Sequence, residues 1–473
     1  MSNRREFLQR GWGLALSAAI PASVQSIVPV RQIDPRGTNG HRLPTRVRGN
    51  PIVRGVGLCD PHLRVFEGKV YLYATHDASP LNSRYTMYDW WVWSSEDMVN
   101  WQLASVLAPE QTFLGSSFDQ CWAVDAATRN GRYYLYFSAG PEQIGVVSSE
   151  TPHGPWVDPL KKPLLAKGFT PTEERDPGIL MDDDETAYIV FGAFDYFIAK
   201  LNEDMVSLAE EPRLLVLDRK VGPYGEGRTG DKPYLHRRHD RYYLSWGCFY
   251  AMADNPYGPF VYKGAIITAE MTAPEFRSQH LLNDRHSSFC EFNGRWFFSC
   301  NDYSQPGTTA WFRDSILCYL NYRDNGDIAP VRIDSIGVGR YDAAGGPIQA
   351  EDYFKLQGPG SVRDLGEGFE VRGLEDGSTL FYPNIENVPT KAKVILRLSS
   401  NGAVKARIDV HEGAPTGPRL GTAVIKDTGS WSRHTNLEVP LSRTCEGMGL
   451  VFVFHGRSGE IARLESWTIA SVR

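Results

Sequence analysis

The chain has 473 residues, 42% hydrophobic and 22% charged, as is typical of a soluble globular protein with two or three domains. Its formal net charge is −6 and it has no basic stripe, which argues against nucleic acid as a partner. The seven cysteines, an odd number without a Cys-x-x-Cys pair, indicate neither a disulfide framework nor a zinc site.

The first residues look like an export signal. Arg4-Arg5 precedes a short apolar stretch of small residues, Gly11 to Ala22, in the order of a twin-arginine (Tat) signal. The stretch is too short to span a membrane. We therefore expect residues 1–25 to be a signal peptide and the protein to be periplasmic or extracellular. Residues 26–50, rich in Arg, Pro and Gly, are expected to form an extended lead-in.

Five later segments share one pattern. In each, an ionisable residue opens a short apolar strand, which turns at Gly, Asn or Asp and returns as a strand rich in aromatic residues. A period of about 50 to 60 residues with one hairpin per unit is typical of a β-propeller. We therefore predict a five-bladed β-propeller over residues 51–338. The segments open at Asp60, Asp125, Asp176, Asp231 and His286.

The shared phase of these residues has a functional consequence. If each unit places its innermost strand at the same point, the five ionisable groups meet on one central axis. Four carboxylates and a histidine in one small space are costly to keep there without a task. The pattern therefore predicts an active or binding site at the axis. The alternative is five unrelated surface residues beside hairpins.

The remaining part of the chain has a different character. After the glycine-rich stretch 337–346, residues 347–473 contain short alternating strands, such as Lys393 to Leu398 and Gly449 to Phe454. This spacing favours a β-sandwich of jelly-roll type. No long segment has helical periodicity, so the whole fold is predicted to be all-β.

Taken as an ordered set, the motifs resemble glycoside hydrolase family 43, a family of five-bladed propellers, over roughly residues 55–335. The C-terminal part is similar to carbohydrate-binding modules of family 6. The first resemblance rests on Asp60-Pro61-His62, Trp93 to Trp101, Trp122 to Asp125, Asp176-Pro177-Gly178, Pro233 to Arg237 and His286-Ser287, and the second on Ala350 to Tyr353 and Thr428 to Trp431.

This resemblance implies an inverting glycosidase that acts through two carboxyl groups. In such enzymes a carboxylate activates water and a carboxylic acid protonates the leaving oxygen, with the two groups roughly 6.5–9.5 Å apart. The resemblance implies that Asp60 is the general base. It also implies that Asp176 raises the pKa of the acid and orients it.

The general acid is where the sequence departs from the family, which carries Glu at the position of Asp231. Asp is one methylene shorter, so its carboxyl group lies about 1.5 Å further back. Three outcomes stay open: Asp231 acts as the acid, which we favour, Glu226 in a glycine-flanked loop replaces it, or hydrolytic activity is lost. Strand alternation predicts that Lys232 faces away from Asp231.

Other residues are candidates for binding. Asp125 and His286 are expected to face the substrate, with structural roles as the alternative. The reaction itself requires no cofactor. The candidate sugar-stacking residues are Trp93, Trp122 and Phe194, although aromatic side chains are more often core. Glu351 and Asp352 are candidate ligands of a structural Ca²⁺, as in related modules.

The resulting functional hypothesis is an exported glycosidase that acts on oligosaccharide or polysaccharide side chains. The resemblance implies an α-L-arabinofuranosidase or a β-xylosidase. The alternative is a catalytically impaired propeller that only binds carbohydrate, which the Asp231 position keeps open.

Overall fold

The computed structural model describes residues 49–277, 285–402, 405–444, 449–457 and 459–472. The signal peptide predicted at 1–25 and nearly all of the lead-in lie outside these residues. Helical structure among the described residues is confined to short 3₁₀ turns. None of the described helices is long and apolar enough to cross a membrane.

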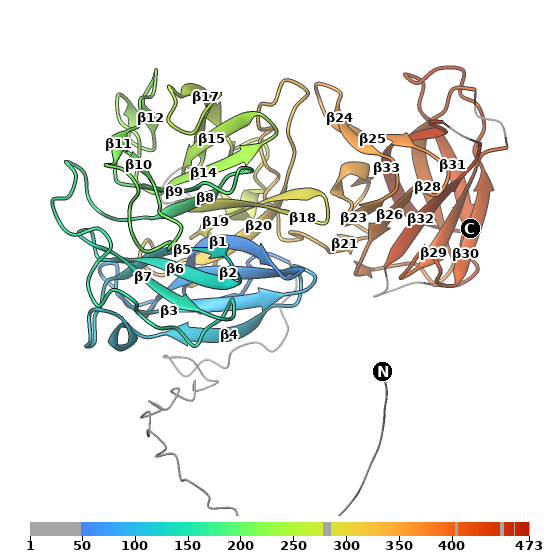
Figure 1. Cartoon of the computed structure of the whole chain (residues 1–473). Coiled ribbons are helices and arrows are strands. Elements are labelled where there is room, and N and C mark those ends of the chain that lie inside the picture. The colour runs from blue at the N-terminus through green and yellow to red at the C-terminus, as the bar shows by residue number, and fades with distance from the viewer. Residues whose placement is uncertain (1–48, 278–284, 403–404, 445–448, 458, 473) are drawn as a thin grey trace, which may run out of the picture.

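Five antiparallel sheets follow one another along the N-terminal part of the chain (Figure 1). Each sheet begins with one of the hairpins predicted from the sequence. Strand order within each sheet follows the sequence, so every sheet is a simple meander. The sheets are β1 Leu58–Phe66, β2 Lys69–Asp77, β3 Met87–Ser95 and β4 Gln102–Leu107; β5 Cys121–Arg129, β6 Arg132–Ala139 and β7 Ile144–Ser149; β8 Gly178–Met181, β9 Ala187–Phe191, β10 Phe197–Lys200 and β11 Arg213–Leu214; β14 Pro233–Arg238, β15 Arg241–Trp246, β16 Phe249–Ala253 and β17 Val261–Ala265; and β18 Ser287–Phe292, β19 Arg295–Asp302 and β20 Asp314–Leu320.

The first strands of the five sheets are neighbours in a ring. β1 contacts β5, β5 contacts β8, β8 contacts β14, β14 contacts β18, and β18 contacts β1. Each sheet has a neighbouring sheet on each of its two faces. This explains why β2, β6 and β20 are buried along almost their whole length rather than on alternate residues. The all-β propeller prediction is confirmed.

The segment just before β1 joins the last sheet. The Ile52 amide donates to the Ser315 carbonyl at 2.8 Å. The Asn50 side chain donates to the Leu317 carbonyl at 3.0 Å and accepts from the Leu317 amide at 2.8 Å. These bonds run along β20, so the beginning and end of the propeller are held together there.

The C-terminal part is a two-sheet sandwich, drawn in orange and red in Figure 1. The hydrophobic core lies between the sheets and includes Leu396, Phe452 and Trp467. One sheet has the order β24-β25-β33-β28-β31, with β22 on β33, and the other β23-β26-β32-β29-β30. The strands are β22 Ile348–Gln349, β23 Lys355–Gln357, β24 Ser361–Asp364, β25 Phe369–Leu374, β26 Thr379–Tyr382, β28 Ala392–Ser399, β29 Arg407–Glu412, β30 Arg419–Val424, β31 Thr435–Pro440, β32 Leu450–His455 and β33 Ala462–Ser471, while β21 Tyr341–Asp342 pairs in parallel with β27 Ile385–Glu386.

Polar and aromatic contacts link the two parts at one junction. Arg332 pairs with Asp352 at 2.7 Å, and the Tyr319 and Tyr341 hydroxyls lie 2.8 Å apart. The Arg295 guanidinium stacks over the Tyr353 ring at 5.0 Å. The sandwich therefore packs directly on the last propeller sheet.

Candidate active site

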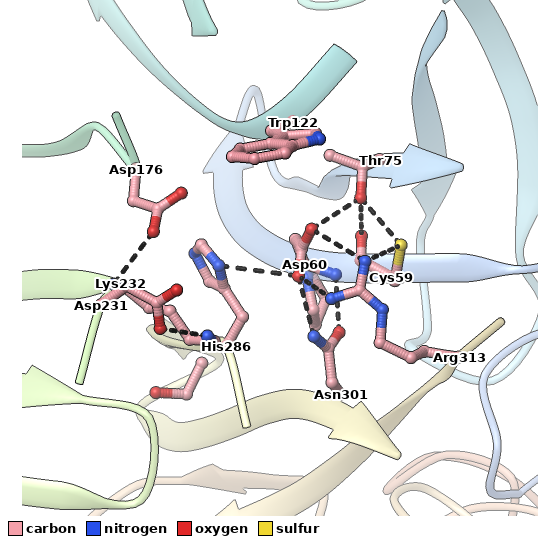
Figure 2. Close-up of polar contacts among 12 residues, drawn as sticks. Cys59, Asp60, Thr75, Trp122, Asp176, Asp231, Lys232, His286, Asn301 and Arg313 are labelled. Carbon is pink, nitrogen blue, oxygen red and sulfur yellow. Dashed lines mark hydrogen bonds and ion pairs between the residues drawn. The ribbon is translucent and has the colours of Figure 1, made fainter. Parts of the chain in front are cut away.

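Five of the predicted site residues meet at one pocket at the propeller axis. Asp60, Asp176, Asp231, Trp122 and His286 all line it (Figure 2). They come from five different sheets or the loops directly before them. The pocket is also lined by Tyr85, Met87, Ala123, Arg175, Lys232 and Arg313.

Asp60 turns its carboxyl group into this pocket through an irregular backbone. Its φ is 49°, and the register of β1 against β2 shifts at this point. Asp and Asn are among the few residues that adopt this left-handed conformation readily. The Asp60 amide donates to Oδ1 of Asn301 at 2.6 Å, which fixes the strained residue against β19.

Both carboxylate oxygens of Asp60 are held by donors. Oδ1 accepts from Asn301 Nδ2 at 2.8 Å and from Arg313 Nη1 at 3.0 Å. Oδ2 accepts from the Thr75 hydroxyl at 2.8 Å. Arg313 also binds Asp77, with Nε 2.9 Å from Oδ2, so one guanidinium serves two buried carboxylates. The arrangement fixes the orientation of the Asp60 carboxylate.

Asp176 lies in the same pocket in a different electrostatic setting. Its φ is 56°, its amide donates to the Ser138 hydroxyl at 2.9 Å, and its Oδ2 accepts from the Lys232 amide at 3.1 Å. Burial raises the pKa of Asp176 to about 7, aided by the charges of Asp231 and Asp60 and opposed by Arg175 and Lys232. Asp176 therefore keeps a proton to much higher pH than an exposed aspartate does.

Asp231 is about a quarter exposed and is held by two cations. Lys232 Nζ donates to its Oδ1, and Arg175 Nη1 lies 3.4 Å from its Oδ2. The prediction that Lys232 faces away is wrong, because Lys232 has φ 68° and alternation applies only to extended backbone. Both cations favour the ionised form of Asp231, which opposes proton donation.

Glu226 lies elsewhere. It belongs to a short hairpin whose strands have two residues each, β12 Val221–Gly222 and β13 Gly225–Glu226, and it is exposed. Arg219 donates to both of its carboxylate oxygens, at 2.8 and 3.0 Å, and this pairing lowers the pKa of Glu226. Glu226 is not among the residues that line the pocket, so the structure does not favour it as a proton donor.

Of the three predicted stacking residues, the structure brings only Trp122 to the pocket. Trp93 is 2% exposed and packs in the core between sheets, which corrects its assignment as a sugar platform. Phe194 packs under the Arg228 guanidinium at 3.8 Å, outside the residues that line the pocket, and its role in stacking on sugar stays a prediction. Tyr85, which no sequence pattern marked as a candidate, also lines the pocket, with its ring edge-on to that of Trp122 and the centroids 6.4 Å apart.

Asp125 is on the axis but not in the pocket. It is fully buried, and its carboxylate accepts from Arg64 Nε at 2.8 Å and from the Ile179 amide at 2.7 Å. Burial alone would raise the pKa of Asp125, but Arg64 and His62 hold it well below its usual range. Its assignment as a residue that contacts sugar is corrected, because no part of it reaches the pocket.

Three polar residues of the site were missed from the sequence: Arg175 and Arg313, which line the pocket, and Asn301, which donates to Asp60. Arg313 and Asn301 lie in the loop after β19 and at its end, where no repeat marks a position facing the axis. Arg175 directly precedes Asp176 and stacks on Trp122 at 5.6 Å. The position of Arg175 next to a candidate acid was the one feature of the sequence that could have identified it.

The two acids predicted as calcium ligands lie at the start of the sandwich, and their role as ligands stays a prediction. Asp352 is paired with Arg332, and Glu351 Oε2 is buried without a hydrogen-bond partner. Burial, followed by the charge of Asp352, raises the pKa of Glu351 to about 8. These acids belong to the junction between the two parts.

Comparisons with known proteins agree with this geometry. The family model of glycosyl hydrolases family 43 matches residues 48–328, and that of carbohydrate binding module family 6 matches residues 349–471. A xylosidase/arabinosidase from Bacteroides ovatus is 28% identical over 331 residues, covering 59% of this chain and 96% of that protein. An arabinoxylan arabinofuranohydrolase from Paenibacillus polymyxa is 26% identical, covering 94% of this chain and 78% of that protein.

A solved structure extends the likeness in fold to both parts of the chain. It is a family 43 arabinoxylan arabinofuranohydrolase from Bacillus subtilis in complex with cellotetraose, with a TM-score of 0.51 and 20% identity. The alignment covers 92% of this chain and 98% of that one.

The raised pKa of Asp176 predicts a dependence of stability on pH. Between the unfolded value near 3.9 and about 7, folded Asp176 keeps a proton that the unfolded chain releases, so its contribution to stability falls as pH rises through this window. Asn cannot ionise. We expect Asp176→Asn to gain about 1–3 kcal/mol of unfolding free energy relative to the wild type between pH 4 and pH 8.

Urea denaturation at several pH values measures this difference. Asp240→Asn, at an exposed turn between β14 and β15, is the matched control and should show no such trend. A difference between Asp176→Asn and the wild type that stays constant with pH would contradict the assignment.

Proposed function

Because this chain belongs to glycosyl hydrolases family 43 and carries a family 6 carbohydrate-binding module, we propose that it removes α-L-arabinofuranosyl or β-xylosyl groups from plant-type polysaccharides or their oligosaccharides. The chain is a glycosidase. The activities after which its relatives are named, xylosidase/arabinosidase and arabinoxylan arabinofuranohydrolase, support the choice of sugar. The Tat-like residues 1–25 support export to the periplasm or the cell exterior.

One observation carries the proposed mechanism: carboxyl groups from three sheets line a single pocket in unequal electrostatic settings. Asp60 lies on the side of Arg313, and Asp176 and Asp231 lie beyond His286 (Figure 2). Hydrolysis with inversion needs this division into a base on one side of the sugar and an acid on the other.

In this mechanism Asp60 accepts a proton from the attacking water. Its oxygens are held by Asn301, Thr75 and Arg313, so the carboxylate is already oriented when water binds. Oriented groups of this kind contribute to catalysis because little reorganisation is needed during the reaction.

Asp231 donates a proton to the leaving oxygen, and Asp176 makes this possible. Burial raises the pKa of Asp176 to about 7, and the charge of Asp231 adds to this, so Asp176 holds a proton near Asp231 up to about neutral pH. Asp231 is the partially exposed member and therefore the one that a leaving group reaches.

The clamp on Asp231 by Lys232 and Arg175 favours the second candidate function, a propeller that binds carbohydrate with impaired hydrolysis. Two measurements on the purified protein separate the two functions: hydrolysis of a panel of aryl glycosides, and sugar binding by calorimetry. Binding without turnover on every substrate would establish the second function.

The first prediction for the enzyme concerns the base. Asp60→Asn keeps the side-chain shape and tolerates the backbone conformation, but it cannot accept the proton from water. We expect turnover to fall about 10²- to 10⁴-fold with an unchanged melting temperature. A folded Asp60→Asn variant with wild-type turnover on aryl arabinofuranoside and xyloside would remove Asp60 from the mechanism.

A second prediction concerns the cations that contact Asp231. Lys232→Asn removes a cation that favours ionised Asp231, and Asn accepts a positive φ. We expect the alkaline limb of the kcat–pH profile to move to higher pH by up to about one unit, because an acid without its neighbouring cation keeps its proton to higher pH.

The control is Lys167→Asn, which breaks an exposed pair with Glu142 far from the proposed chemistry. An alkaline limb that stays in place or moves downward in Lys232→Asn would show that Asp231 does not supply the proton.

A further inference from the structure

The proposed acid marks the side of the pocket from which the leaving group departs. In hydrolysis with inversion, the acid contacts the oxygen of the leaving group, and the base holds its water on the opposite face of the sugar. Asp231 and Asp60 lie on either side of His286 in Figure 2. The surface next to Asp231 therefore receives the part of the substrate beyond the bond that breaks.

The loop that carries Phe194 borders this side of the pocket. The Phe194 amide donates to the carbonyl of Gly230, the residue directly before Asp231, at 2.7 Å. Two residues earlier, the Gly192 amide donates to the carbonyl of Arg175 at 3.0 Å. Because Arg175 and Asp231 both line the pocket, these two bonds fix the loop at its rim.

The β12–β13 hairpin stands beside this loop. Trp246 Nε1 donates to the Val221 carbonyl at 2.7 Å, which ties the base of the hairpin to β15. Lys220, directly before β12, pairs with Asp195, directly after Phe194. The hairpin is therefore held both by the propeller sheet that contains β15 and by the Phe194 loop.

Three side chains from the loop and the hairpin form one cluster, which we call the rim platform. The Arg228 guanidinium lies 3.8 Å from the centre of the Phe194 ring and 5.2 Å from that of the Tyr224 ring. The centroids of the two aromatic rings are 6.2 Å apart, and the rings are inclined at 58°. Tyr224 lies at the turn of the hairpin and is 64% exposed, so most of its surface is open to a ligand.

Two polar groups of the rim platform are available to a ligand. Among the described residues, neither the Arg228 guanidinium nor the Tyr224 hydroxyl has a hydrogen-bond or ion-pair partner. The neighbouring Arg219, in contrast, is paired with Glu226. A guanidinium has five N–H donors, and sugar hydroxyls accept hydrogen bonds. Aromatic surfaces with a few such donors are typical of sites that bind small molecules.

The backbone of Phe194 supports a role in binding. Its φ is 67°, in the left-handed region that bulky residues rarely adopt, whereas glycine or asparagine adopts it at lower cost. Strain of this kind persists where neighbouring contacts enforce it, and it is most frequent at ligand sites. Here the Thr229 hydroxyl donates to the Phe194 carbonyl at 2.6 Å, and the result is an aromatic ring beneath Arg228.

We propose that Tyr224 and Arg228, supported by Phe194, bind the sugar chain of the leaving group. One ring of that chain packs on the exposed face of Tyr224, and its hydroxyls accept hydrogen bonds from Arg228. The preferred substrates are then oligosaccharides or polysaccharides, whose leaving group reaches the rim platform, rather than short glycosides. The inference rests on the proposed function, because Asp231 marks the leaving-group side only if it is the acid.

Tyr224→Ala removes the stacking surface. The substrates to compare are a 4-nitrophenyl glycoside and an oligosaccharide with the same terminal sugar, which is xylotetraose for a xylosidase or an arabinose-substituted xylotriose for an arabinofuranosidase. We expect kcat/KM for the oligosaccharide to fall about three- to tenfold more than kcat/KM for the aryl glycoside, the size of one aromatic contact. The loss should lie mainly in KM, because the rim platform holds the leaving group equally in the ground state and in the transition state.

Two further variants make the test specific. Arg228→Ala removes the donors of the rim platform and should lower the ratio of the two kcat/KM values in the same direction. Arg213→Ala is the matched control, because it breaks a similar stack, on Tyr257 at 4.6 Å, in the outermost strand of another part of the propeller. It should leave the ratio unchanged, and an equal fall in the ratio in Arg213→Ala and Tyr224→Ala would overturn the inference.

Inhibition by sugars tests the same surface without cleavage of an oligosaccharide substrate. The inhibitors are xylose and xylotriose, and the reaction that they inhibit is hydrolysis of the 4-nitrophenyl glycoside. This readout reports binding at the propeller, so sugar bound by the C-terminal sandwich does not affect it. We expect the wild type to bind xylotriose about tenfold more tightly than xylose, and Tyr224→Ala to lose most of this difference. An inhibition constant for xylotriose that is the same in both proteins would contradict the proposal.

The outcomes separate this inference from the proposed function. If the wild type hydrolyses the aryl glycoside but the ratio of the two kcat/KM values is the same in Tyr224→Ala, the inference fails while the function stands. If the wild type hydrolyses neither substrate, the proposed function fails, and the inference fails with it.

Discussion

Buried carboxyl groups at the propeller axis are the constraint around which the rest of the site is built. An unpaired ionised carboxylate in an apolar interior is strongly unfavourable. The chain offsets this cost with nearby cations. From other sheets come Arg64 for Asp125, and Arg313 for Asp60 and Asp77. The partly exposed Asp231 is paired with Arg175 from another sheet and with its own neighbour Lys232. Asp176 has the least compensation, and its carboxyl group retains a proton instead.

This pairing pattern also divides the catalytic roles. The carboxylate with a guanidinium and two further hydrogen-bond donors, Asp60, is suited to accept a proton, while the Asp176–Asp231 pair holds one. The division requires that the sheets stay in register around the axis. The bonds between Asn50 and Leu317 hold the first and last parts of the propeller together, and Arg332 with Asp352 joins the sandwich to it.

The repeat in the sequence was enough to predict the propeller and to bring Asp60, Asp176, Asp231 and His286 to one axis, because their position in each unit is set by strand order. It could not reveal Arg313 or Asn301, which lie outside that phase. The reversed side chain of Lys232 depends on a positive φ that no pattern of residue types marks. Trp93 lies on the third strand of its sheet, and spacing alone does not separate a residue packed between sheets from one that faces the axis.

The central claim is that water attacks from the Asp60 side while the proton comes from the Asp231 side. Proton nuclear magnetic resonance of the first sugar released from an aryl glycoside tests this claim most directly, before the anomers equilibrate. If water attacks from the Asp60 side, the released sugar has the anomeric configuration opposite to that of the substrate. Release of the retained anomer would contradict it, because that outcome requires a carboxylate that bonds to the sugar instead of one that activates water.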